Sequence, residues 1–186
     1  MKRLRRAGLA AGVAVVVAVL GSGSSSATIS PDPYSTTTAT GSITSRSILG
    51  TLTCGLSSVS VILAGAPLGA SGNIPSLTPS TCTGIAMGAS ATLVTGAAPA
   101  WLAIAGASPG SAQGTATLRD ARVLFTLNGM IARCLYGGTL TGSVANGSAA
   151  ITVRNPAARL VATLSGVCTA SQDVSMTIST AATITW

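Results

Sequence analysis

The sequence predicts an all-β fold, either an antiparallel β-sandwich or a small barrel of about ten short strands held by two disulfides. Apolar residues alternate with Ser and Thr along most of the chain, as expected for strands with one buried and one solvated face. Stretches rich in Gly, Pro and Ser interrupt this alternation and predict turns. The chain also contains four cysteines. These observations fit a sandwich and a barrel equally well.

Residues 1–27 have the composition of a Sec-type signal peptide. Four basic residues come first, an apolar run follows from Ala7 to Leu20, and Ser25 and Ala27 supply the small residues that a signal peptidase requires. An uncleaved anchor is the alternative, but this apolar run is shorter than the ~20 residues that span a bilayer. We therefore expect cleavage after Ala27, no stable transmembrane helix afterwards, and a secreted or cell-envelope location.

Residues 28–47 are rich in Ser and Thr, contain Pro31 and Pro33, and show little apolar periodicity. They offer little to bury, so we expect a flexible arm that ends in a first strand around Ile43. The remaining residues, 48–186, are long enough to form a single β domain with a sizeable core.

The first part of this domain alternates from Leu52 to Leu63, which predicts strands. Residues 65–73, GAPLGASGN, break the pattern and predict a loop. The next stretch is the most apolar after the signal: Trp101 and its alternate neighbours are apolar, and so are Leu102 and Ile104. We expect a strand buried on both faces with Trp101 as a core anchor. A ligand-facing Trp101 is the alternative.

Turn signals divide the second part of the domain. Asn128-Gly129 follows a predicted strand at 123–127, and Asn146-Gly147 between two alternating runs predicts a two-residue hairpin turn. Asn155-Pro156 predicts that the chain turns again. The closing strands are predicted at 160–164, 174–178 and 182–186.

Four cysteines in an exported chain predict two disulfides, for which three pairings exist. We expect Cys54 to pair with Cys82 and Cys134 with Cys168, because each of these pairs encloses one predicted meander. In the chain-entropy model each disulfide stabilises the fold by roughly 3 to 4 kcal/mol.

The sequence lacks the residues that most catalytic mechanisms require. The chain has no histidine and no glutamate, and lysine occurs only in the predicted signal, so no general base is available to a nucleophilic serine or cysteine. Asp120, beside Arg119 and Arg122, is better explained as a surface ion pair than as one of two glycosidase carboxylates. The cysteines are too widely spaced for a zinc site. We predict a non-enzymatic protein without metal or cofactor.

The mature chain has six arginines and three aspartates, a net charge near +3, with few aromatic residues. This composition argues against nucleic-acid binding. Strand alternation places several arginines on one sheet face, so Arg154 and Arg159 are candidate contacts for anionic cell-envelope polymers or acidic lipids. Solvated arginines that keep the surface soluble are the alternative. A hydrophobic ligand near Trp101 and Leu102 is a further candidate.

Several short motifs carry a resemblance to a known group of proteins. GTLTCGL, STCTG, Pro99 to Trp101, RCLYGGTLTGS and GVCTAS resemble a largely uncharacterised group of small four-cysteine bacterial secreted β-proteins, similar to the secreted alkane-oxidation activator type. The resemblance covers about Thr51 to Trp186 and implies export and a β-rich fold. It supplies no catalytic residue, and the role it implies is extracellular help with a hydrophobic substrate such as an alkane or lipid.

The sequence thus predicts a secreted or cell-surface β-domain with a structural or binding role. An outer-layer β-barrel or pore is a second hypothesis, since the alternating strands and the terminal TITW are typical of outer-membrane strands. Against it, the mature chain has too few aromatic residues for girdles at both membrane interfaces.

Overall fold

The computed structural model describes residues 28–47, 50–84, 88–94, 99–127 and 131–186. The predicted signal peptide and the Asn128-Gly129 turn lie outside these residues. The described residues form these strands: β1 (Thr28–Ser30), β2 (Tyr34–Ser47), β3 (Gly50–Ala66), β4 (Gly69–Gly84), β5 (Ser90–Leu93), β6 (Ala100–Gly106), β7 (Gln113–Leu127), β8 (Ala132–Ala145), β9 (Ala150–Ser165), β10 (Ser171–Ser179) and β11 (Thr183–Thr185).

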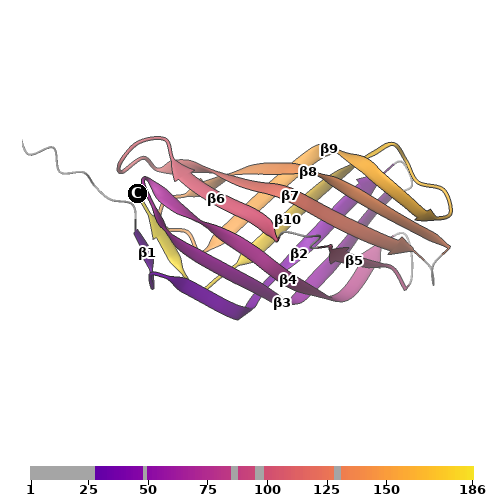
Figure 1. Cartoon of the computed structure of the whole chain (residues 1–186), viewed down its shortest axis with the longest axis horizontal. Coiled ribbons are helices and arrows are strands. Elements are labelled where there is room, and N and C mark those ends of the chain that lie inside the picture. The colour runs from indigo at the N-terminus through magenta and orange to yellow at the C-terminus, as the bar shows by residue number, and fades with distance from the viewer. Residues whose placement is uncertain (1–27, 48–49, 85–87, 95–98, 128–130) are drawn as a thin grey trace, which may run out of the picture.

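The large sheet is antiparallel and closes on itself. Its strand order is β5-β7-β6-β4-β3-β2-β10-β9-β8, and β7 also pairs with β8 along most of its length. β6 pairs with the first half of β7 and β5 with the second half, so these two short strands share one position in the wall. The result is an eight-stranded barrel, seen from the side in Figure 1. The all-β antiparallel prediction is confirmed, with the barrel selected over the sandwich.

Alternation along each strand fills the barrel with apolar side chains. On β3, Val59, Val61 and Leu63 are fully buried while Ser60 and Ile62 face outward. The other wall strands alternate in the same way, with interruptions where the register shifts at a bulge. The largest fully buried side chains are Ile43, Leu63, Ile74, Leu102, Leu118, Leu140, Ile151, Met176, Ile178, Ile184, Val59 and Val61.

The prediction of a flexible arm at residues 28–47 is wrong, because β2 is a full wall strand between β3 and β10. Tyr34, Ala39, Ile43 and Ser45 point inward and are buried. The apolar period of this segment is weak because a small residue and a serine occupy two of these inward positions. Ser45 is satisfied there by a hydrogen bond from the Gln172 side-chain amide.

The predicted loop at residues 65–73 is largely strand. β3 and β4 are joined at Pro67-Leu68, with Leu68 in a left-handed conformation (φ 62°). Gly69 and Gly72 belong to β4, where a Cβ atom would approach the backbone oxygens of Ile104 and Ile62 to 1.8 and 1.9 Å. These glycines permit close contact between neighbouring strands and do not mark a loop.

Both predicted disulfides are confirmed. Cys54 and Cys82 face each other on neighbouring strands β3 and β4. Cys134, on β8, is bonded to Cys168 in the loop between β9 and β10.

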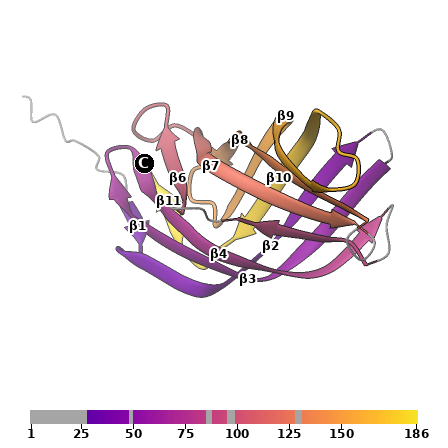
Figure 2. The same ribbon diagram turned by 45° about the vertical axis from the view of Figure 1, so that its right-hand side comes forward.

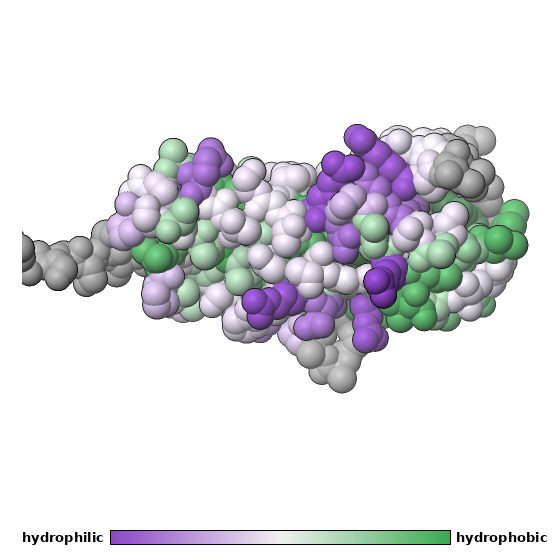
Figure 3. Space-filling model, turned by 90° about the horizontal axis from the view of Figure 1, so that it is seen from above, coloured by the Kyte–Doolittle hydropathy of each residue, from purple (hydrophilic) through white to green (hydrophobic). Residues whose placement is uncertain are grey.

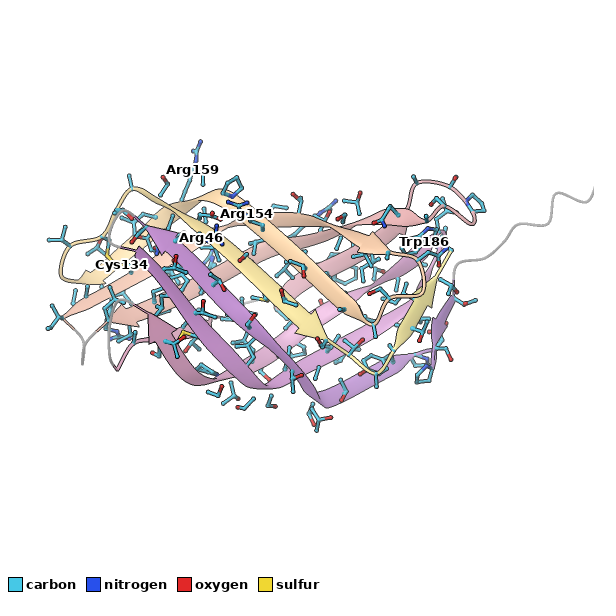
Figure 4. All side chains as sticks on the ribbon, turned by 180° about the vertical axis from the view of Figure 1, so that it is seen from behind. Arg46, Cys134, Arg154, Arg159 and Trp186 are labelled. Carbon is cyan, nitrogen blue, oxygen red and sulfur yellow. A yellow bond between two sulfur atoms is a disulfide. The ribbon has the colours of Figure 1, made fainter. Side chains whose placement is uncertain are left out.

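The two ends of the barrel differ. The Trp186 end carries β1, β11 and the loops after β3, β6, β8 and β10; Figure 2 shows β1 beside β11 there. The Cys168 end carries the loop 166–170 and the strand ends near Ser47, Gly84 and Leu127. Figure 4 labels Trp186 and Cys134 near opposite ends of the molecule.

Candidate binding surface at the Cys168 end

The loop 166–170 is fastened tightly to the barrel. The Cys134–Cys168 disulfide holds its middle, and the hydroxyl of Tyr136 lies 3.1 Å from the backbone oxygen and 2.9 Å from Oγ1 of Thr169. The backbone oxygen of Ala170 accepts a hydrogen bond from the Leu160 amide. Val167 is nevertheless 93% exposed. The fold therefore displays an aliphatic side chain on an anchored loop.

Further exposed aliphatic residues lie beside the loop 166–170 and along the last part of β9. At Gly166 (φ 68°) a Cβ atom would lie 2.2 Å from the backbone oxygen of Ile131, so the loop runs directly against Ile131, which is 72% exposed. Leu164 and Val161, both more than half exposed, lie on the last part of β9. These are four of the six exposed large hydrophobic residues of the described chain. Figure 3 shows hydrophobic residues gathered at this end. We call Val167, Ile131 and Leu164 the aliphatic tip; Val161 lies further back on β9, against Gly137.

A small pocket of about 50 Å³ opens beneath the tip. Its apolar walls include Phe125 and Tyr136, whose ring centroids lie 6.1 Å apart in an edge-to-face arrangement. The other lining residues are Ser47, Leu52, Leu127, Cys134, Val167, Cys168, Thr169 and Gln172. A drug-sized ligand needs a pocket of at least ~300 Å³, so this one admits no more than the end of an alkyl chain.

The arginines lie on the outer wall behind the tip. Arg154 and Arg159 are an odd number of residues apart on β9, yet both face outward, because the strand holds one extra residue between them. Pro156 lies in this bulge, where the Ala157 amide donates a hydrogen bond to Oδ1 of Asn155. The predicted turn of the chain at Asn155-Pro156 is therefore wrong, because β9 continues through it.

β7 has a matching bulge at the same level. Asp120, in a left-handed conformation (φ 56°), is the extra residue between Leu118 and Ala121, which pair with Leu140 and Gly138 of β8. The two bulges flank Gly137 and Gly138, where a hollow of about 220 Å³ forms on the outer surface. It is lined by Asp120, Ala121, Arg122, Gly137, Gly138, Thr139 and Val161.

The two predicted arginines differ in their electrostatic state. Arg154 makes a bidentate ion pair with Asp173, including an Nε to Oδ1 hydrogen bond of 2.8 Å. Hydrogen bonding from Arg154 lowers the pKa of the Asp173 carboxyl; burial opposes this, and the charges of Arg154 and Arg46 add to it. The same hydrogen bond raises the pKa of Arg154. Arg159 makes no ion pair with any described residue, and the same holds for Arg46, Arg119, Arg122 and Arg133.

Trp101 lies elsewhere on the surface. It faces outward from β6 with 41% of its surface exposed, which corrects the prediction of a core anchor in a strand buried on both faces. Its cross-strand neighbours are Asn73 on β4 and Arg119 on β7, with Ile62 next in the same row. Two strands, β7 and β8, separate β6 from Arg159 on β9. The structure therefore does not gather Trp101, Arg154 and Arg159 into one site, and Leu102 is buried inside the barrel.

No family model, curated protein or solved structure matches this chain.

Sequence reasoning missed the aliphatic tip. Val167 stands next to Cys168 in a stretch without alternation, and this was the available signal that it belongs to a loop. Its exposure depends on where the disulfide places that loop, which the alternation does not encode.

In the described part of the chain no group of three His, Cys, Asp or Glu side chains is placed to hold a metal ion. The same residues contain no helix long and apolar enough to cross a membrane.

Proposed function

We propose that this protein is a non-enzymatic, secreted or cell-surface β-domain that binds at the cell envelope through the Cys168 end of its barrel. The observation that carries the proposal is the aliphatic tip, where the fold holds Val167 on a disulfide-anchored loop and leaves it 93% exposed. Contiguous exposed apolar residues rimmed by polar ones are typical of interaction surfaces. Two disulfides favour an oxidising location.

The polarity of the barrel favours this proposal over a pore. A transmembrane barrel presents an apolar band to lipid and a polar interior. Here the inward positions carry Val, Leu and Ile, and the outward positions of β3 and β10 are largely Ser and Thr.

A role as an extracellular helper for a hydrophobic substrate, such as an alkane or lipid, is the second candidate. The apolar pocket beneath Val167 favours it, because the end of an alkyl chain fits there beside Phe125 and Tyr136. Trp101 is less suited to such a ligand, since it lies on the open wall between Asn73 and Arg119.

Fractionation of the native host followed by a pull-down of envelope fractions tests the primary proposal. We expect the protein outside the cytoplasm, without free thiols, and retained by an envelope fraction. Recovery from the cytoplasm with reduced cysteines would overturn the location, and the absence of retention by any envelope fraction would overturn the binding role.

A further inference from the structure

We propose that the Cys168 end docks on an anionic lipid surface, with the aliphatic tip entering the interface and the unpaired arginines behind it contacting lipid phosphates. This inference rests on the proposed function and names its partner class. Two independent observations carry it: the position of the exposed aliphatic residues and the distribution of charge along the barrel.

The tip has the form of a shallow anchor. Val167 and Ile131 project from adjoining backbone at the end of the barrel, and Leu164 lies near the end of β9. The pocket beneath them is too small to enclose a lipid chain, so the apolar area becomes buried only by entering an apolar medium. The disulfide and the Tyr136 hydrogen bonds already order the loop, which reduces the entropic cost of insertion.

Charge is distributed unevenly along the barrel. Arg46 and Arg133 lie within two residues of strand ends at the Cys168 end, and Arg122 and Arg159 flank Gly137 behind the tip. Figure 4 places Arg46, Arg154 and Arg159 nearer to Cys134 than to Trp186. At the Trp186 end the charged side chain of the described residues is an acidic one, Asp32, which accepts a hydrogen bond from the Gly65 amide.

This distribution complements an anionic surface. Asp173 neutralises Arg154, and Asp120 offsets one of the arginines beside it, so Arg46, Arg133, Arg159 and one of Arg119 and Arg122 remain as excess positive charge. Figure 3 shows the hydrophilic region of the wall adjoining the hydrophobic end. In an anionic lipid layer, the acyl chains would contact the aliphatic tip while the phosphates above them would contact the arginines. A soluble anionic polymer matches the arginines but leaves the tip exposed.

Vesicle co-sedimentation tests the proposal. The purified, oxidised protein is mixed at low salt with vesicles of phosphatidylglycerol and phosphatidylcholine, or of phosphatidylcholine alone. We expect binding to the anionic vesicles that weakens with added salt. Val167→Ser with Leu164→Ser should lower the partition coefficient about tenfold or more, and Arg122→Ser with Arg159→Ser roughly 30-fold. Ile62→Ser, which removes an exposed aliphatic side chain from the wall, is the matched control and should bind normally.

Each other outcome counts against the proposal. If Ile62→Ser weakens binding as much as the tip variant, the tip is not the anchor. If soluble polyphosphate displaces the protein and the tip variant binds vesicles normally, the arginines hold anions without insertion. If sedimentation velocity shows a dimer that the tip variant abolishes and vesicles do not bind, the tip contacts a second copy. Retention by envelope fractions without vesicle binding would remove the lipid assignment and leave the proposed function standing.

Discussion

The two ends of the barrel are completed in opposite ways. At the Trp186 end an indole fills the opening: Trp186 is 5% exposed, its ring lies against Gly106 and Gly114, and its Nε1 donates to the Ser111 backbone oxygen at 2.8 Å. At the Cys168 end an exposed valine stands on an anchored loop, and both disulfides lie in the half of the barrel nearest it. Packing and hydrogen bonds close one end, whereas covalent bonds hold the other with its aliphatic residues exposed.

The largest effect on this contrast is expected from Trp186→Ala. Removal of a buried indole leaves a cavity against two glycines that cannot fill it, and costs about 3 to 5 kcal/mol of unfolding free energy. Urea denaturation followed by circular dichroism measures the loss. Thr183→Ala, at an exposed position of β11, is the control and should change stability little. A loss below about 1 kcal/mol in Trp186→Ala would show that the indole does not close this end.

Replacing each disulfide in turn should distinguish its effect on the loop 166–170 from its effect on the free energy of unfolding. In the chain-entropy model Cys134→Ser with Cys168→Ser, and Cys54→Ser with Cys82→Ser, each cost roughly 3 to 4 kcal/mol, since the sequence separations are 34 and 28 residues. Of the two disulfides, only Cys134–Cys168 is attached to the loop 166–170. We therefore expect faster amide exchange in this loop only when Cys134 and Cys168 are replaced. Equal exchange in both variants would contradict the anchoring role.

Local signals predicted much of the wall and both cysteine pairs. The Asn146-Gly147 signal marks the connection between β8 and β9, although the loop has four residues, 146–149, and not two. Asn146 faces Ser111 and Trp186 across the end of the barrel, and the Gly147 amide donates to the Ile184 backbone oxygen. These tertiary contacts hold the four-residue loop against the end of the barrel.

Features that depend on closure could not be predicted. Alternation identifies strands but not the pairing of β7 with β8 that selects a barrel. It also does not show that the wall leaves the outer face of β6 uncovered, which exposes Trp101. The outward position of Arg159 depends on a bulge at Asn155-Pro156, where the sequence resembles a turn. The candidate surface at the Cys168 end was therefore hidden, because its members come from separate strands and a loop.

The hydrogen bonds at the Trp186 end predict a smaller effect. The Asn146 amide donates to the backbone oxygens of Ser111 and Trp186, at 3.2 and 3.0 Å. Both acceptors keep another donor, Trp186 Nε1 and the Gly110 amide respectively, so Asn146→Ala should cost only about 1 kcal/mol. In a double-mutant cycle with Trp186→Ala the two losses should be less than additive, as measured by urea denaturation. Full additivity would mean that Asn146 does not support the indole.

The smallest effect concerns the charged wall near the Cys168 end and depends on pH. Because Arg154 lowers the pKa of Asp173 in the folded state, the ion pair stabilises the protein above the pKa of an unfolded aspartate. This contribution disappears as the pH falls through the lower, folded-state pKa. Asp173→Asn should therefore be slightly less stable than the original protein at neutral pH, and the difference in urea midpoint should shrink in acid. Asp32 and Asp120 are present in both proteins, so their contributions cancel in the comparison. A difference that stays constant down to the folded-state pKa would show that the ion pair does not set it, and that the amide substitution itself disturbs the wall beside Arg46.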